Sequence, residues 1–429
     1  MTHRSRIGRQ ASTLLLCVFS ISFVPSARPA AAWLTESGGA DMAMASAGRA
    51  ALAADATTVA SNPVGMSSLP GNHLAIAVLP ARLDLEFDAA DPSAGSASNS
   101  DGVTPLGSVF LVHTDGRVSW GLGVHSYLGL GFDYGEDWTG SRMIQDAHLG
   151  SLNVTPAVSW QASDDVDVGV SLNAQLADAE VAMGVSSDAQ IYGPPVGMAG
   201  GRLRLDGDSW ALGANIGVMY RPDAATRLGL TWNSGTNHDL DLEVDAADLH
   251  PVLAAMLTSV GTAQLEMSFP QQVLLSGVRQ LTPATSIAAS VAWQEWSSFG
   301  ESQLQVTDRR VPVFPTGLDD TWHISMGVRH QLAPQWMIAS GVAYDTDPAS
   351  GEPMPIYFPV SDQLRAALGL EYRPWDELTI RLSYSMLNQG AVRVDHQYHP
   401  LPLPGMSPVP GEVASSRMHA IAIAFERRW

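Results

Sequence analysis

Cysteine and lysine are nearly absent from this chain of 429 residues, which holds one cysteine and no lysine. The single cysteine, Cys17, lies in an apolar N-terminal run that we expect to be removed from the mature protein. Without a thiol, the mature chain can form no disulfide, no thiolate metal site and no thiol nucleophile. We interpret the absence of lysine as a bias of genome composition.

Basic residues are also few, with 23 arginines against 43 acidic residues. Four of these arginines precede residue 33, so the mature chain keeps 19 basic and 43 acidic residues, a net charge of −24. Nucleic acid binding depends on basic groups that neutralise phosphates, so we expect no nucleic acid partner. After the N-terminal run, no stretch of eighteen apolar residues follows, which excludes a membrane-spanning helix.

The first 32 residues have the order of a secretory signal peptide. Arg4, Arg6 and Arg9 precede the apolar run 11–24, and small residues at 30–32 form a cleavage site. The apolar run is too short for a transmembrane helix. We therefore expect residues 1–32 to be cleaved near Ala32.

The remaining chain is dominated by stretches with an apolar residue at every second position. In residues 165–176, for example, Val166, Val168 and Val170 alternate with polar or small residues. This period gives a strand one apolar and one polar face. Fourteen such strands are predicted, at residues 73–87, 105–113, 118–130, 150–161, 165–177, 209–220, 225–233, 271–281, 285–296, 321–331, 335–345, 362–373, 376–386 and 416–429.

The connections between these strands alternate between long and short. Long loops are expected at residues 88–104, 131–149, 178–208, 234–270, 297–320, 346–361 and 387–415, and the six connections between them are short turns rich in Asp, Pro and Gly. Seven long loops and six short turns place both termini at the short-turn end. The pattern predicts an all-β fold, a fourteen-stranded antiparallel transmembrane β-barrel, because a closed sheet leaves no backbone group unpaired in lipid.

Aromatic spacing supports this prediction. Trp210 and Tyr220 lie on one face, ten residues apart, which corresponds to roughly 25 Å along the axis of a tilted barrel. That distance matches a lipid-facing band with an aromatic girdle at each edge, and Trp336 and Tyr344 repeat the arrangement. The alternative is a soluble secreted sandwich or solenoid, whose strands also alternate but need no aromatic residues at both edges.

The polar faces of the strands predict a lumen that contains arginine. By parity, Arg227, Arg329, Arg365 and Arg381 point inward, where they could bind a ligand carboxylate through paired hydrogen bonds. The favoured alternative is that these arginines pair with acidic residues of the barrel itself.

Residues 33–72, between the leader and the first strand, are too many for a tether and too poor in β-branched residues for a strand. Residues 40–54 are rich in Ala and Met, and Asn62-Pro63 ends that region in a turn. An empty fourteen-stranded barrel would leak, so we expect residues 33–72 to form a partly helical plug, and residues 73–429 to form the barrel.

Four parts of this segment form a recognisable pattern: Glu36-Ser37, residues 47–51, residues 55–58 and residues 62–66. Further parts follow along the mature chain at residues 293–297, 320–322 and 341–345 with Pro348, and at the C-terminal aromatic residue. Together they resemble the outer-membrane long-chain fatty acid transporters and their aromatic-hydrocarbon relatives, and residues 33–72 resemble the hatch of that family. The hatch positions it designates are Glu36, Gly48, Asn62, Pro63 and Gly65. The sequence departs from the family pattern at Val64, at residues 232–234 and at Trp429.

The resemblance implies passive uptake of hydrophobic molecules across the outer membrane of a Gram-negative bacterium. A ligand would be captured by the loops, bound in the barrel, released by a shift of the hatch and discharged sideways through a gap at a kinked strand. For capture, the apolar residues of a predicted amphipathic helix are candidates, unless they pack on neighbouring loops: Leu249, Val252, Leu253, Met256 and Leu257. For the lateral gap, alternation is lost at Ser126 and the strand continues into Gly129 and Gly131, where an ordinary strand end is the alternative.

Catalytic motifs are missing from the sequence, which has no Gly-x-Ser-x-Gly elbow and no His-Glu-x-x-His pair. We expect no enzyme, no cofactor and no metal, although an outer-membrane lipase or protease remains a rival because a triad assembles only in the fold. A general porin for polar solutes is the second rival, and the plug argues against it.

The expected partners are therefore a fatty acid or aromatic hydrocarbon, outer-membrane lipid and the barrel assembly machinery, which would recognise the C-terminal strand ending at Trp429. The protein is expected to be a monomer with both termini in the periplasm.

Overall fold

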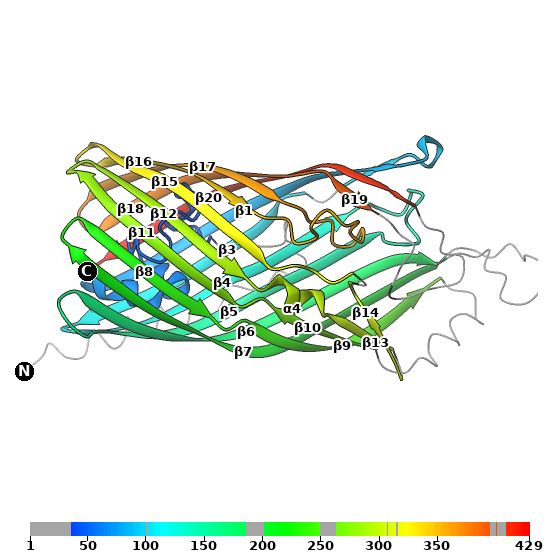
Figure 1. Ribbon diagram of the computed structural model, residues 1–429, viewed down its shortest axis with the longest axis horizontal. Helices are drawn as coiled ribbons and strands as arrows, with labels where there is room; N and C mark the ends of the chain where they lie inside the picture. Colours follow the sequence, from blue (N-terminus) through cyan, green and yellow to red (C-terminus); the bar gives the residue numbers. More distant parts are fainter. Residues whose placement is uncertain are drawn as a thin grey trace, which may run out of the picture.

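The computed structural model describes residues 36–99, 102–185, 201–248, 263–306, 308–314, 316–394, 400 and 409–429. The strands run obliquely around a single closed cylinder (Figure 1). Among the described residues, no helix is long and apolar enough to cross a membrane. The predicted signal peptide lies outside this part of the chain.

The wall of the cylinder contains the fourteen predicted strands, which confirms the predicted fold. They are β1 (Gly71–Ala89), β3 (Thr104–Asp115), β4 (Val118–Asp133), β5 (Asp146–Gln161), β6 (Val166–Val185), β7 (Gly201–Asp223), β8 (Thr226–Asn233), β11 (Gln272–Thr282), β12 (Thr285–Gln294), β15 (Thr321–Ala333), β16 (Trp336–Asp345), β17 (Gln363–Trp375), β18 (Leu378–Gln389) and β20 (Gly411–Arg428).

Each wall strand pairs antiparallel with the next, and the ring closes where β1 meets β20, with Ile76 opposite Phe425. The backbone N–H of Asn72 donates to the carbonyl of Trp429, which fastens the two ends of the barrel together. No strand edge is left for another chain to pair with along this seam.

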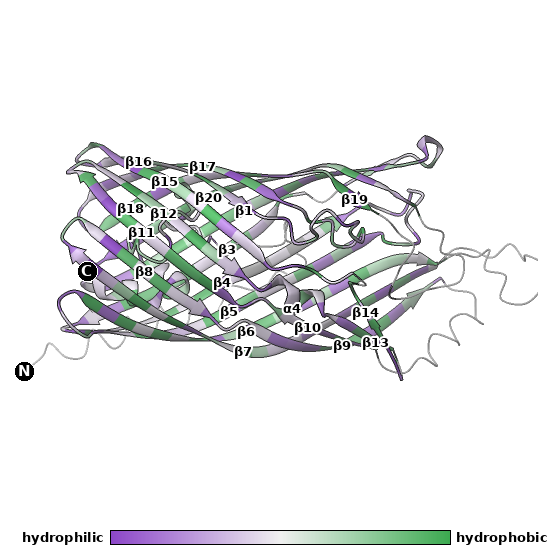
Figure 2. Ribbon diagram, in the orientation of Figure 1, coloured by the Kyte–Doolittle hydropathy of each residue, from purple (hydrophilic) through white to green (hydrophobic). Residues whose placement is uncertain are grey.

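Alternation along each strand places apolar side chains outside and polar ones inside. Leu172 is 59% exposed and Leu212 81% exposed, whereas Asp167 and Ser171 are fully buried. Figure 2 shows hydrophobic and hydrophilic residues alternating along the strands of the wall. Trp210 is also exposed, as are Tyr220, Trp336 and Tyr344, so the aromatic residues that mark the predicted girdles do point outward.

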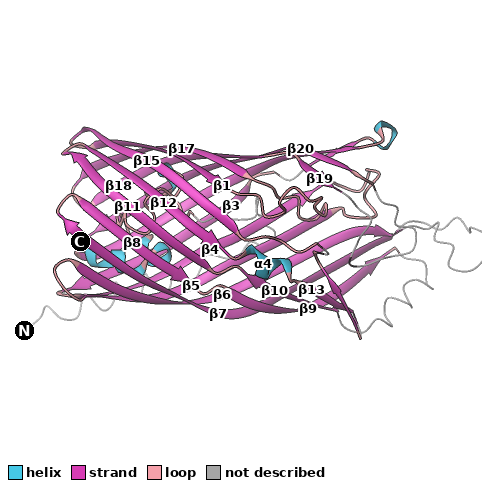
Figure 3. Ribbon diagram, in the orientation of Figure 1, coloured by secondary structure: helices cyan, strands magenta, loops and turns pink. Residues whose placement is uncertain are grey.

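The two ends of the cylinder differ, as Figure 3 shows. Short turns and the C-terminus lie at one end, and the other end carries additional strands and short helices. These additions are β2 (Ser96–Ser98), β9 (Thr236–Ala247), β10 (Ala263–Phe269), β13 (Gln303–Val306), β14 (Arg309–Pro312), β19 (Val392–Val394), η3 (Pro92–Ala94) and α4 (Trp296–Gly300).

Several of these elements lie in regions that the sequence pattern predicts to be loops. β9 pairs with the extended part of β7, β10 pairs with β9, and β13 joins β10 to β14, which continues the wall beyond the barrel rim. The predicted strand 285–296 was too long at its end. It stops at Gln294, because Trp296 begins α4 and turns its side chain into an aromatic cluster, where it is 5% exposed.

Residues 36–70 precede β1 and fold inside the cylinder near the short-turn end. We call these residues the hatch. Its only regular elements in the described chain are η1 (Met42–Met44), α2 (Thr58–Ser61) and η2 (Pro63–Ser68), and turns connect them. Nearly all hatch side chains are buried, so the segment fills the lumen rather than lining it.

Candidate functional site

The hatch is held against the wall by hydrogen bonds from its backbone. The N–H of Gly48 donates to Ser290 Oγ at 2.8 Å, and the N–H of Ala50 donates to Ser276 Oγ at 3.1 Å. On the opposite side, Ser108 Oγ donates to the carbonyl of Ser37 at 2.6 Å. Because these bonds satisfy buried backbone groups, they fix the path of the chain across the lumen.

Three of the designated hatch residues shape the turn before η2. The fully buried Asn62 donates from Nδ2 to the carbonyl of Ala50 at 2.7 Å and accepts from the N–H of Val64 at 3.2 Å. Pro63 occupies the first position of η2, where its missing N–H costs nothing, and the N–H of Gly65 donates to the carbonyl of Asn62. Asn62 thus joins the two halves of the hatch.

Ion pairs with the wall add to these hydrogen bonds. Arg365 of β17 donates to Glu36 at the start of the hatch, and both side chains are buried. Arg381 of β18 lies 3.3 Å from Asp55 of the hatch and also binds two acidic residues of the wall, Glu371 at 2.8 Å and Glu426 at 3.0 Å. Buried pairs of this kind are costly to break, because the remaining charge has no partner.

The balance between burial and the attraction of a nearby arginine differs for two acidic residues of the hatch. Burial alone would raise the pKa of Glu36, but the attraction of Arg365 outweighs it and holds that pKa below its ordinary value. For Asp41, burial prevails over the attraction of Arg49, 3.3 Å away, and raises the pKa to about 7. Asp41 therefore changes its charge near neutral pH while Glu36 stays ionised.

The four lumen arginines predicted from parity do point inward, but they do not form one site. Three of them pair with acidic residues of the chain itself: Arg365 with Glu36 of the hatch, Arg381 as described above, and Arg329 with Glu371 at 3.6 Å. Arg227 of β8 differs, because no ion pair joins it to a carboxylate of the described chain. Glu371 and Glu426 were not predicted from the sequence, although their parity on β17 and β20 places them on the inner face.

Toward the long-loop end, the lumen becomes apolar. A continuous group of buried apolar side chains, here called the apolar region, runs from Met42 of the hatch along Leu79 and Leu83 of β1 to Phe87. Within it the ring centroid of Phe299 lies 5.3 Å from that of Phe358 and 5.5 Å from those of Trp296 and Phe314, and Trp138 forms a second aromatic group with Phe87 and Tyr134. Polar side chains border this region, such as His238, whose ring centroid lies 5.0 Å from that of Phe269. Its apolar surface suits hydrophobic molecules and would leave an ion without a partner.

The wall beside the apolar region is interrupted. Pairing between β3 and β4 ends at Ser108 opposite His125, and beyond this point β3 pairs with β1 and β4 with β5. Between Ser126 and Gly129 two residues of β4 face one residue of β5, which is a β-bulge. The bulge falls where the sequence pattern loses its alternation, and Gly129 and Gly131 follow it in β4.

The predicted capture residues lie outside the described part of the chain: Leu249, Val252, Leu253, Met256 and Leu257. Within the described residues, no group of three His, Cys, Asp or Glu side chains is arranged to hold a metal ion.

Comparison with known proteins shows which family has this architecture. The family model described as "Outer membrane protein transport protein (OMPP1/FadL/TodX)" matches residues 20–425. A long-chain fatty acid transport protein of Escherichia coli O6:H1 is 23% identical over 388 residues, which cover 84% of this chain and 87% of that protein.

Solved structures agree with the fold. A Pseudomonas aeruginosa FadL homologue superposes with a TM-score of 0.80 at 19% identity, over 93% of this chain and all of that chain. The Pseudomonas putida toluene transporter TodX superposes with a TM-score of 0.68 at 14% identity, over 92% of this chain and 99% of that chain.

The family match covers far more than half of the chain, and its members are transport channels rather than enzymes. The short-turn end with both termini is accordingly the periplasmic end, and the long loops are extracellular. The chain belongs to the OMPP1/FadL/TodX family of outer-membrane proteins that transport hydrophobic compounds.

Proposed function

We propose that this protein takes up long-chain fatty acids passively across the outer membrane. The observation that carries the proposal is the apolar region, whose buried apolar side chains extend continuously from Met42 of the hatch to Met354, Ile356 and Phe358 of an extracellular loop. Each CH₂ group of an alkyl chain that moves from water into such a region stabilises the bound state by about 0.8 kcal/mol. The region therefore binds long alkyl chains more tightly than short ones. The name of the E. coli relative, a long-chain fatty acid transport protein, agrees with this substrate class.

The proposed route has four steps. A fatty acid is captured by the extracellular loops, for which residues 249–257 are candidates from the sequence alone, and then enters the apolar region. A shift of the hatch opens the path, and the molecule leaves sideways through the interruption between β3 and β4. The position of the interruption supports this exit, because Phe132 of β4 belongs to the apolar region and Leu106 of β3 packs against it.

Uptake by whole cells tests the proposal. Cells that lack the gene and cells that express it are given labelled oleate, toluene and a small sugar. We expect expression to raise the entry of oleate and to leave the entry of sugar unchanged. A rise for toluene alone would assign the protein to aromatic hydrocarbons, which the aromatic cluster around Phe299 could also accept. Entry of sugar without oleate would contradict the proposal.

The lateral exit has a test of its own. Deletion of Leu128 removes the additional residue of the bulge and leaves the registers on both sides as they are, with Ser126 opposite Leu152 and Gly129 opposite Gly150. We expect the deletion to lower oleate entry to the level of cells without the gene. The matched control is Tyr127→Ala, which keeps the number of residues and should keep the activity. Full activity of the deletion variant in correctly folded barrels would rule out exit at this place.

A further inference from the structure

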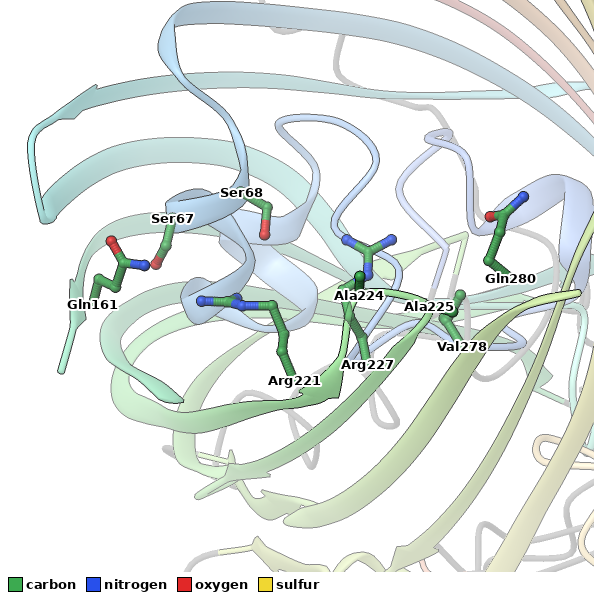
Figure 4. A pocket seen from close by; sticks show the side chains of 9 residues that line it. All are labelled: Ser67, Ser68, Gln161, Arg221, Ala224, Ala225, Arg227, Val278 and Gln280. Atoms are coloured by element: carbon green, nitrogen blue, oxygen red, sulfur yellow. The ribbon is translucent and has the colours of Figure 1, made fainter. Parts of the chain in front are cut away.

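A polar cavity of about 430 Å³ lies at the periplasmic end of the barrel, between the hatch and the wall. The polar side chains that line it come from η2 of the hatch, from the ends of β5 and β7, and from β8 and β11: Ser67, Ser68, Gln161, Arg221, Arg227 and Gln280. Figure 4 shows Arg221 and Arg227 extending from the wall toward the hatch. The cavity is separate from the apolar region described above, with which it shares no residue.

The hatch bounds this cavity on its inner side. Arg227 and Gly229 are both on the inner face of β8, and the carbonyl of Ala50 passes so close to Gly229 that a Cβ there would lie 2.1 Å from it. Arg227 is two residues nearer the periplasmic turn, so its side chain extends beneath the point of contact. Ala224 and Ala225 of that turn form the outer rim, which leaves the cavity accessible from the periplasm.

The charge in the cavity is not balanced. Arg221 binds both carboxylate oxygens of Asp167 at 2.7 Å and is therefore neutralised. The charged groups that act on Arg227 are Arg329 and Arg221, both cations, and within the described chain no acidic residue pairs with it. A half-buried cation without a counterion costs free energy. The chain has a net charge of −20, so acidic residues that could pair with an arginine are plentiful in it.

Hydrogen-bond donors accompany the charge. The Ser68 hydroxyl and the Gln161 side-chain amide line the cavity, and neither forms a side-chain hydrogen bond with the described residues. A guanidinium flanked by a hydroxyl and an amide matches the oxygen atoms of a carboxylate or a phosphate, which accept several short, charge-assisted hydrogen bonds.

We propose that this cavity binds a small oxyanion, a carboxylate or a phosphate, through Arg227 from the periplasmic side. The polar lining suits a headgroup and not an alkyl chain. The oxyanion has two possible sources: the carboxylate of a fatty acid, or a phosphate, either free or on a phospholipid of the inner leaflet. The proposal does not depend on the substrate class or the exit route given under Proposed function.

Binding to the purified full-length protein in a non-ionic detergent tests this site. Sodium acetate and inorganic phosphate are titrated separately by calorimetry at constant ionic strength, and nanodiscs with phosphatidylglycerol or phosphatidylcholine are compared by native mass spectrometry. We expect the wild type to bind at least one of the two anions. Preference for acetate would indicate a fatty acid source, and preference for phosphate and for phosphatidylglycerol would indicate a phosphate source.

Two variants and a control assign the binding to Arg227. Arg227→Gln should weaken binding roughly tenfold or more, because a hydrogen bond to a charged group contributes about 1.5–3 kcal/mol. Arg279→Gln is the control, because Arg279 is exposed on the neighbouring strand and pairs with Asp223 outside the cavity. Should Arg227→Gln fail to fold, Ala224→Glu places a carboxylate on the rim, which should compete for the arginine and abolish binding. Absence of binding to either anion, or unchanged binding in Arg227→Gln or in a folded Ala224→Glu, would overturn the proposal.

Discussion

At the scale of single residues, Arg381 connects more of the interior than any other arginine of the described lumen, since it binds Glu371, Glu426 and the hatch residue Asp55. Removing it would leave three buried carboxylates without their shared cation. We predict that Arg381→Met lowers the free energy of unfolding by roughly 3–5 kcal/mol, the range for breaking a buried ion pair. Urea unfolding in detergent micelles would measure this.

The control for that prediction is Arg279→Met, which removes an exposed pair with Asp223. Exposed pairs contribute at most about 1 kcal/mol, so this variant should unfold close to the wild type. Equal loss of stability in the two variants would show that burial of the Arg381 cluster has no special effect.

Asp41 gives the hatch a dependence on pH. Its pKa of about 7 in the folded protein exceeds the ordinary value of 3.8, so the folded state holds a proton that the unfolded chain releases between these two values. Stability should therefore fall as pH rises from about 4 to about 7 and should stay level above that, by a total of at most a few kcal/mol.

We predict that Asp41→Asn removes this slope and stabilises the protein at pH 8 relative to the wild type. Unfolding in urea at pH 5 and pH 8 measures both effects. Asp84→Asn, at an exposed position paired with Arg82, is the matched control and should keep the slope. If Asp41→Asn unfolds with the slope of the wild type, another group is responsible for it.

Parity along the strands was sufficient to predict which arginines face the lumen. It could not predict their partners, because Glu36 and Asp55 belong to a hatch whose path depends on tertiary packing. For the same reason parity could not predict that Arg227 has no acidic partner in the described chain. Whether an inward arginine forms an ion pair depends on segments far apart in the sequence.

At the scale of elements, the backbone of the hatch comes very close to the wall at two glycines, which have no side chain in the way. At Gly341 of β16 a Cβ would lie 2.0 Å from the carbonyl oxygen of Met44, and at Gly229 it would lie 2.1 Å from that of Ala50. Backbone atoms cannot yield as a flexible side chain can, so a methyl group at either position should displace the hatch.

We predict that Gly229→Ala raises the ion conductance of single barrels in a planar lipid bilayer, because a displaced hatch no longer seals the lumen. Gly277→Ala on the adjacent β11 is the control, since its Cβ would meet Leu228 at an ordinary distance of 3.4 Å. Equal conductance of the two variants would mean that the hatch accommodates the methyl group and still seals the lumen.

The sequence predicted the wall strands well because lipid on one side and a polar lumen on the other impose a strict period of two. The short strands beyond the rim were missed for a physical reason. β9 also alternates, but the apolar side chains of Leu240, Leu242 and Val244 pack against protein rather than lipid. The strict order of long loops and short turns gave such a strand no place in the predicted hairpins.

At the scale of the whole molecule, the barrel closes through β1 and β20 without the hatch taking part in the strand ladder. We predict that deletion of residues 36–70, with the signal sequence retained, still yields a folded barrel. Its single-channel conductance should be large and stable, and cells that produce it should become sensitive to hydrophilic antibiotics.

Heat-modifiable migration in gel electrophoresis would verify that the deletion variant is folded. A folded variant that remains electrically silent would show that the extracellular apolar region alone closes the barrel. In that case the hatch would contribute to the structure of the protein but would not be needed to close the lumen.

The packed aromatic and aliphatic side chains between Met42 and Phe87 have a kinetic consequence. A cargo molecule must displace neighbours that already touch one another, so each passage waits for a thermal rearrangement and does not resemble flow through an orifice. Throughput should consequently level off at high external supply and slow steeply on cooling, as turnover by a carrier does, even though no fuel is consumed.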